Sequence, residues 1–262
     1  FPRKEIAQIQ EKISYRDNLV VQAETFHLWV IEAPKKVAKE FPADKAGLHV
    51  LFVPSEEPYH KRKVTLLNGP HTVLSPVAFL SGVNIVRDAC NDEGISKYIH
   101  KVQFDELMQT LDLPMEELEK FASDVLERFD NPYVDHQVTS IMLNSFPKFC
   151  ARDLPGVKTY LERKGELPKG LVFGLAAIIT YYKGGKREDG VEIVPNDSQE
   201  IMDLLKDLWA TGDTQKVADG VLGATSIWSE DLNKVEGLNA MVKQYLDLIQ
   251  SKGMLEAVKT II

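Results

Sequence analysis

The sequence lacks several features that would point to common classes of protein. It has only two cysteines, Cys90 and Cys150, which provide neither a disulfide framework nor the ligand spacing of a metal site. Acidic residues outnumber basic ones by 39 to 31, and the net charge of −8 disfavours a general nucleic-acid binder, which needs a basic face. No apolar run approaches the ~20 residues of a membrane helix. We therefore expect a cytoplasmic protein with reduced thiols, and no membrane or nucleic-acid partner.

A glycine-rich phosphate loop is also missing. No G-x-G-x-x-G follows a strand, and the glycine pairs Gly184-Gly185 and Gly220/Gly223 stand in the wrong context for a dinucleotide-binding turn. The first residues, FPRKEIAQIQEK, show neither an initiator methionine nor the apolar segment of a signal peptide. We expect the chain to be a portion of a longer protein.

Two short runs near the start have the composition of β-strands. His27–Ala33 and Gly47–Val53 are apolar and rich in β-branched and aromatic residues, and a proline follows each of them. After Glu57 the apolar spacing becomes helical and remains so. The pattern predicts a mainly α protein, with a strand-containing segment over residues 1–57 and a multi-helical domain over residues 58–262.

The helical part divides at proline, glycine and capping residues. Helices are expected at Lys61–Gly82, Val83–Cys90, Ser96–Thr110, Pro114–Phe129, Asn131–Ser145, Pro155–Gly165 and Gly170–Tyr182, then at Asp197–Ala210, Thr214–Gly223 and Glu236–Gly253. The polar, glycine-containing stretch Lys183–Asp197 predicts a loop, a small hairpin or a sub-domain junction.

The segment KRKVTLLNGPHT, which begins at Lys61, contains the candidate chemistry. At ~100° per residue, Lys63, Asn68 and His71 fall within one arc of ~140° on an ideal helix. Pro70 has no backbone N–H to donate to the carbonyl four residues earlier. We therefore expect a kink and an unpaired carbonyl acceptor at Leu66, close to the asparagine.

Spacing alone leaves two interpretations of this segment open. The basic run Lys61-Arg62-Lys63 is typical of a solvated helix face. The apolar flank VLSPVAFL indicates instead that the polar residues are only partly exposed. A part-buried lysine beside other cations has its ammonium form disfavoured, which suits it to proton transfer.

KVTLLNGPHT resembles the Lys-x4-Asn-x2-His signature of the long-chain polyol and mannitol dehydrogenase family. The flanking PYHKRKV and SPVAFLSG, and the more distant ETFHLWVIEAP and RFDNPYVDHQVTSIMLNSFPKFCARDLP, extend the resemblance over the whole chain. Members of that family have an N-terminal Rossmann-type domain that binds NAD(P) and a helical C-terminal domain that supplies a catalytic lysine. The resemblance implies that this chain is the C-terminal portion. Residues 1–57 would complete the edge of a coenzyme domain that lies mainly outside it.

The resemblance also implies roles for individual residues. Lys63 would be the general acid and base, Asn68 would donate a hydrogen bond to the developing alkoxide, and His71 would position a substrate hydroxyl. Lys148 matches a substrate-contacting lysine. NAD would be the cofactor, and no residue of this chain is assigned to its binding.

The chain departs from the mannitol-specific pattern at three positions. His60 stands where those members have a glutamate, and Ser140 and Leu143 stand where they have an arginine and a histidine. These departures weaken the case for mannitol and fit a different substrate, such as a sugar acid.

A sugar acid needs a cation for its carboxylate, and Arg62, Lys148 and Arg152 are candidates. A fructuronate or mannitol reductase of the same family and a non-catalytic helical interaction module remain alternatives. His100 and His136 have no carboxylate or cysteine at metal spacing, so no metal site is expected.

Overall fold

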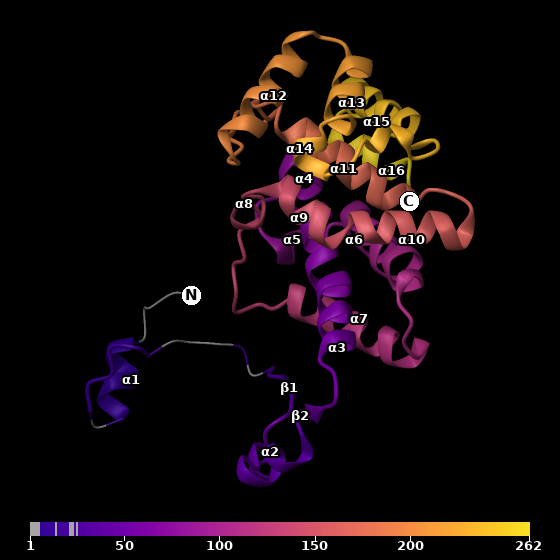
Figure 1. Ribbon diagram of the computed structural model, residues 1–262. Helices are drawn as coiled ribbons and strands as arrows, with labels where there is room; N and C mark the ends of the chain where they lie inside the picture. The colour runs from indigo at the N-terminus through magenta and orange to yellow at the C-terminus, as the bar shows by residue number, and fades with distance from the viewer. Residues whose placement is uncertain (1–5, 14, 21–23, 25) are drawn as a thin grey trace. The chain divides into compact units, whose positions relative to one another are not determined.

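The computed structural model describes residues 6–13, 15–20, 24 and 26–262, and these form two compact units. The first consists of the described residues up to His60, and the second is Lys61–Ile262. Helix α3 (Glu57–Lys63) contains the point of division. The expectation of a mainly helical protein is confirmed, because every element described in the second unit is a helix except the two short strands β3 and β4 (Figure 1).

The first unit contains a short β-α-β arrangement. Its elements are α1 (Ile6–Lys12), β1 (Trp29–Glu32), α2 (Lys35–Glu40), the 3₁₀ helix η2 (Ala43–Ala46) and β2 (Val50–Val53). The two strands are parallel, with Trp29 opposite Val50 and Glu32 opposite Val53. Both predicted strands are therefore confirmed, although each begins two or three residues later than the sequence pattern indicates. Two parallel strands joined by a helix are the repeating unit of an α/β sheet.

The second unit is a helical assembly. Its first half contains the π-helix η3 (Val64–Asn68), α4 (Gly69–Leu80), α5 (Val86–Asn91), α6 (Glu93–His100), the π-helix η4 (Lys101–Leu107), the 3₁₀ helix η5 (Met108–Thr110), α7 (Met115–Phe129), α8 (Val138–Ile141) and α9 (Ser145–Arg152). Its second half contains α10 (Leu154–Lys164), α11 (Lys169–Tyr181), β3 (Gly185–Lys186), β4 (Glu192–Ile193), α12 (Gln199–Ala210), α13 (Thr214–Leu222), α14 (Thr225–Trp228), η6 (Leu232–Lys234), α15 (Leu238–Lys252) and α16 (Met254–Lys259).

Helix α11 is the centre of this unit, as its apolar sequence predicts. Every residue from Gly170 to Tyr181 is buried, and α4 and α15 pack against it. The α4–α11 contact depends on Gly174, since a Cβ there would lie 2.4 Å from the Cβ of Val73. The glycine lets the two backbones approach closely, which fixes α4 and the motif at its N-terminal end. None of the helices in the described ranges combines the length and apolarity that a bilayer crossing requires.

The stretch from Lys183 to Asp197 forms the small hairpin that was one of its predicted outcomes. Strands β3 and β4 pair antiparallel, with Gly185 opposite Ile193. The buried Arg187 fixes the hairpin to the end of α4, donating to the carbonyl of Phe79 at 2.9 Å and to Oδ1 of Asn84 at 2.8 Å. The additional role as a sub-domain junction stays a prediction.

The predicted helix Asn131–Ser145 is wrong over most of its length. Within this range only α8, Val138–Ile141, and Ser145 at the start of α9 are helical, because residues 131–137 bind residues 85–87 instead. Gln137 forms an antiparallel bridge with Ile85, and Arg87 donates to the carbonyl of Pro132 at 3.0 Å. These long-range backbone contacts replace the local bonds that a helix starting at Asn131-Pro132 would make.

Candidate active site

The motif lies where one long helical path changes its winding. Helix α3 continues into the π-helix η3, and η3 continues into α4, so the chain is helical from Glu57 to Leu80. The N–H of Gly69 donates to the carbonyl of Val64, five residues earlier, as a π turn requires. This wider turn lies between Lys63 and the two other motif residues. The arc of ~140° calculated for the three residues on an ideal α-helix therefore does not apply to them. π segments inside α-helices are rare and often occur at functional sites.

The expectation of an unpaired carbonyl at Leu66 is wrong. The missing N–H of Pro70 does leave that carbonyl without its usual donor, but the side chain of Gln103 replaces it, with Nε2 2.8 Å from the oxygen. Gln103 is fully buried on η4 and comes from 37 residues further along the chain. No local sequence signal identifies this partner.

Lys63 lies at the end of α3 and is exposed, yet its pKa is lowered. Partial burial of the ammonium is the main cause, and the positive charges of Arg152 and Arg128 add to it. All three effects disfavour the protonated amine. Lys63 is thus more exposed than the sequence predicts, although it has the expected cationic neighbours, and its role in proton transfer stays a prediction.

His71 is held as a neutral imidazole. Burial is the main cause that lowers its pKa to about 3, and the nearby His136 and Arg152 lower it further. Its ring stacks on Phe129 at 3.9 Å between centroids and meets His136 edge-on at 5.3 Å. The buried Nε2 has no hydrogen-bond partner among the described residues. A neutral imidazole with a free ring nitrogen can bind a hydroxyl.

Lys148 and Arg152 reach the same region from α9, one turn apart. Arg152 donates to Oγ1 of Thr72 at 3.2 Å, and Thr72 directly follows His71 in the chain. Lys148 donates to the carbonyl of Ile141 at 2.7 Å. Burial is the main cause that lowers the pKa of Lys148, and Arg152 contributes to it. Two of the three predicted carboxylate partners are thus near each other and near the motif.

The remaining predicted residues lie in different surroundings. Arg62 packs over the ring of Phe121 on α7, at 4.5 Å from its centroid, and faces Glu117 at 3.8 Å. Asn68 is half-buried at the end of η3. His60 is exposed on α3, one turn before Lys63.

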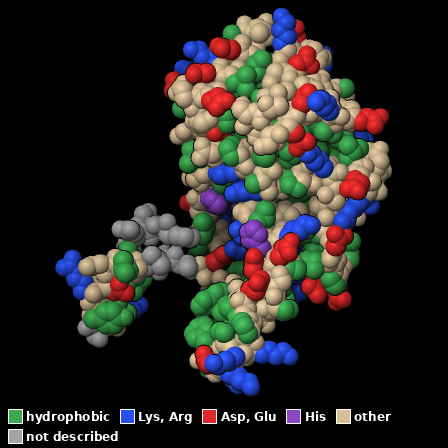
Figure 2. All heavy atoms as spheres, viewed as in Figure 1, with side chains coloured by type: hydrophobic (Ala, Val, Ile, Leu, Met, Phe, Trp, Pro, Cys, Tyr) green, Lys and Arg blue, Asp and Glu red, His purple; other side chains and the backbone are tan. Residues whose placement is uncertain are grey.

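Sequence reasoning missed two residues of the site, Arg128 and His136. Arg128 is near enough to lower the pKa of both Lys63 and His71, and His136 contacts the His71 ring. Only the fold of residues 131–137 brings His136 there, so no spacing rule would have found it. We call Lys63, His71, Arg128, His136, Lys148 and Arg152 the basic cluster. Figure 2 shows histidine and Lys/Arg side chains close together on the viewed face of the helical unit.

Comparison with known proteins assigns the family. Residues 56–250 match the mannitol dehydrogenase C-terminal domain. The chain belongs to this family. An altronate oxidoreductase of Bacteroides thetaiotaomicron is 79% identical over the whole chain, and the match covers 55% of that protein. An altronate oxidoreductase of Escherichia coli is 41% identical over 99% of the chain and 54% of its own length. The chain thus spans about half the length of these relatives.

Solved structures of mannitol dehydrogenase type share the fold. Mannitol 2-dehydrogenase of Pseudomonas fluorescens, solved in a ternary complex with NAD and D-mannitol, superposes with a TM-score of 0.73. It is 21% identical, and the match covers 82% of this chain and 43% of that one. A D-sorbitol dehydrogenase in substrate-free form gives a TM-score of 0.76 at 23% identity, over 97% of this chain and 51% of that one.

Ser140 and Leu143, two of the positions at which the chain departs from the mannitol-specific pattern, both lie at the surface. Ser140 is exposed, and its hydroxyl donates to the carbonyl of Gln137 at 2.7 Å. Leu143 is 45% exposed, directly before α9. Neither side chain carries a charge.

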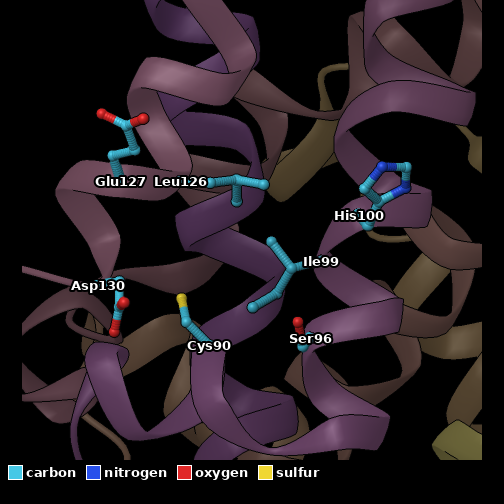
Figure 3. A pocket seen from close by; sticks show the side chains of 7 residues that line it. All are labelled: Cys90, Ser96, Ile99, His100, Leu126, Glu127 and Asp130. Atoms are coloured by element: carbon cyan, nitrogen blue, oxygen red, sulfur yellow. The ribbon is translucent and has the colours of Figure 1, made fainter.

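A separate pocket of about 290 Å³ lies among α5, α6 and α7. Its seven lining residues include none of the predicted site residues; Cys90 and Ile99 point into it in Figure 3. Burial raises the pKa of the Cys90 thiol to about 12, which makes it unreactive. In the described part of the chain, no group of His, Cys, Asp and Glu side chains is arranged to hold a metal ion.

Proposed function

We propose that the full-length protein containing this chain interconverts D-tagaturonate and D-altronate by NAD-dependent hydride transfer, with Lys63 as the acid and base. The main support is the basic cluster: a lysine of lowered pKa, a neutral histidine and further cations converge at the motif. The similarity to altronate oxidoreductases of Bacteroides thetaiotaomicron and Escherichia coli supports this chemistry. Among the described residues near Lys63, the charges that shift its pKa are all positive, which suits an anionic substrate.

Lys63 would move the proton. In ketone reduction its ammonium donates a proton to the developing alkoxide, and in alcohol oxidation its neutral amine removes the hydroxyl proton. The lowered pKa favours the neutral amine. The carboxylate of a bound sugar acid adds negative charge to the cluster and raises the pKa of Lys63 again, which favours the ammonium needed for reduction.

Asn68 and His71 would orient the reacting centre. The amide of Asn68 donates a hydrogen bond to the oxygen that becomes an alkoxide, where such a bond is strongest in the transition state. His71 stays neutral across the physiological range, so its ring binds a substrate hydroxyl without adding another charge. Its stacking on Phe129 fixes the plane of the ring.

Arg152 and Lys148 would bind the carboxylate. Arginine forms paired hydrogen bonds with a carboxylate, and Lys148 adds a second charge from the same helix. Arg62 is already engaged by Phe121 and Glu117, so it is the weakest of the three candidates. His60 is a candidate for contact with a distal hydroxyl.

NAD supplies or accepts the hydride when bound, and the preceding part of the protein would hold most of it. The β1–α2–β2 unit has two parallel strands but no glycine-rich turn after either of them. It exposes Trp29 by 55% and Leu48 by 50%, apolar surface that further strands and helices of a coenzyme domain would cover. This arrangement agrees with residues 1–57 being the edge of a coenzyme domain and 58–262 the catalytic domain.

A substrate panel on the full-length protein tests the proposal. NADH oxidation is followed with tagaturonate, fructuronate, fructose and tagatose, and then with NADPH in place of NADH. We expect the highest kcat/KM with tagaturonate and NADH. A preference for fructuronate or fructose would assign another reaction of the family, and no turnover of any ketose would favour a non-catalytic helical module. The 262-residue chain alone should be inactive.

A further inference from the structure

The π-helices η3 and η4 lie against each other. Helix η3 contains Asn68 and follows Lys63, and η4 packs on it from the interior. A π turn has poorer hydrogen bonding than an α turn, so a stretch of this kind persists only where surrounding contacts hold it. The contacts that η4 makes with the motif identify what holds it.

Two side chains of η4, one turn apart, make these contacts. Gln103 donates to the carbonyl of Leu66 at 2.8 Å, in the middle of η3. Leu107 packs on Gly69 at the end of η3, where an added Cβ would lie 3.0 Å from Leu107 Cδ1. The carbonyl is accessible to Gln103 because Pro70 cannot donate to it.

Among the described residues, the Gln103 side chain makes no hydrogen bond besides the one to the Leu66 carbonyl. It is 0% exposed, and its Oε1 has no partner among the described residues. Burying half of an amide unpaired costs free energy. The bond to Leu66 is the compensating interaction.

The winding of η3 sets the direction in which Lys63 points relative to Asn68 and His71. If the segment relaxed toward an α-helix, the two ends would turn against each other by a large part of the ~100° that separates successive residues. That rotation would take the Lys63 amine away from the position defined by Arg152 and Arg128.

We propose that Gln103 is a positioning residue for Lys63: its hydrogen bond to the Leu66 carbonyl holds the π-helix that aims the lysine at the reacting centre. Gln103 touches neither substrate nor coenzyme, and it acts through the backbone of η3. The expected effect on kcat rests on the proposed function. The expected effect on the position of Lys63 does not.

The test compares two equal substitutions in the full-length protein. Gln103→Met keeps the side-chain volume but removes the donor. Gln109→Met is the control, because Gln109 also donates to a backbone carbonyl, that of Phe104 at 3.2 Å, without contacting the motif. We expect Gln103→Met to lower kcat for tagaturonate by about 10- to 100-fold with KM within about threefold, as for a catalytic group displaced by ~1 Å. Gln109→Met should keep kcat within about twofold.

A second readout does not depend on turnover. Reductive methylation with ¹³C-formaldehyde labels the lysines, and the Lys63 signal is identified by its absence in Lys63→Arg. Its pKa is lowered by burial, Arg152 and Arg128, so in Gln103→Met it should rise toward 10.5, while Gln109→Met leaves it unchanged.

The outcomes separate the two proposals. If the wild type fails to reduce any sugar acid, the proposed function is wrong, but the Lys63 titration still tests the role of Gln103. An unchanged Lys63 pKa in Gln103→Met, or a kcat equal to that of Gln109→Met, would overturn that role. If Gln103→Met does not fold, Gln103→Glu decides: the protonated acid still donates, so its kcat relative to wild type should be higher at pH 6 than at pH 9. An equal ratio at both pH values would contradict the proposal.

Discussion

The basic cluster and the buried acids of the same helical unit respond to burial in opposite ways. Burial lowers the pKa of His71 to about 3, whereas it raises that of Glu106 to about 7 and that of Asp153 well above its usual range. In each case burial disfavours the charged form. Burial also lowers the pKa of Lys63, Lys148 and Arg152, the same direction as for His71. Asp153 also acts on the cluster, because its charge raises the pKa of the neighbouring Arg152.

Position along the chain does not explain this difference. Asp153 directly follows Arg152, but its carboxyl lies against the backbone of Gly69, where an added Cβ would be 2.8 Å from Oδ1. Neither carboxyl oxygen has a hydrogen-bond partner among the described residues. Glu106 accepts from the N–H groups of Gly170 and Leu171 at 2.7 and 2.8 Å, at the start of α11. One acid therefore caps a helix, and the other is buried without a hydrogen bond among the described residues.

The opposite shifts give opposite pH dependences of folding stability. His71 binds a proton in the unfolded chain near pH 6.5 but not in the folded one, so its contribution falls as pH falls below that value. Glu106 and Asp153 bind protons more tightly when folded, so their contributions fall as pH rises through and above the usual range for carboxyl groups. The basic cluster and the buried acids can therefore be changed one at a time.

Lys63→Ala should have the largest effect. Loss of a general acid or base lowers turnover by about 10²- to 10⁴-fold, and we expect kcat of the full-length protein to fall in this range with tagaturonate. Lys63 is exposed, so the thermal midpoint should change little. Steady-state kinetics and a melting curve check both points. Lys61→Ala is the control, and a Lys63→Ala rate near that of wild type would remove the proton-transfer role.

Arg152→Gln should weaken sugar-acid binding selectively. A hydrogen bond to a charged group contributes about 1.5–3 kcal/mol, so kcat/KM for tagaturonate should drop by about 10- to 100-fold. The value for tagatose, which has no carboxylate, should change far less. Lys206→Gln on the exposed face of α12 controls for net charge. Equal losses for the two sugars would show that Arg152 does not bind the carboxylate.

Glu106→Gln should flatten the pH dependence of stability. The wild-type acid, with its pKa raised from 4.5 to about 7, loses up to about 3 kcal/mol of folding stability as pH rises from 4.5 to 7. The glutamine cannot ionise, although its amide pairs less well with the two N–H groups of α11. Thermal midpoints at pH 5 and pH 8 measure the slope. A slope as steep as that of wild type would mean that Glu106 is not the titrating group.

Asp153→Asn should stabilise the fold slightly at pH 8. The buried carboxylate is disfavoured there, and asparagine has nearly the same shape without the ionisation. We expect an increase of about 1 kcal/mol, or roughly 2–4 °C, which disappears near pH 4. Asp207→Asn, at an exposed position, should change nothing. A lower thermal midpoint at pH 8 would indicate that the charged form of Asp153 supports the fold.

Much of the fold could be predicted from local pattern. The strands near Trp29 and Val50, the amphipathic α7 and the buried α11 all follow from apolar spacing and capping residues. The helix predicted from Asn131 failed because its backbone is bound by residues near Ile85, a contact that no local pattern contains. Local signals give elements whose hydrogen bonds are internal, and they miss those whose partners are distant.

The site was only partly predictable for the same reason. The motif made Lys63 and His71 candidates, and Pro70 correctly marked a break in ordinary helical bonding. The hydrogen bond of Gln103 to the Leu66 carbonyl could not be foreseen, because the two residues are 37 positions apart. Arg128 and His136 were missed since neither lies at a fixed spacing from the motif.

Chemical rescue of Lys63→Ala is the most direct test of the central claim that Lys63 moves the proton within a basic cluster. Altronate oxidation by the full-length variant is measured with added primary amines of increasing basicity. The account predicts that small amines restore turnover in proportion to their concentration, that more basic amines are more effective, and that Lys61→Ala shows no such dependence. A folded, substrate-binding Lys63→Ala protein that no amine accelerates would contradict it.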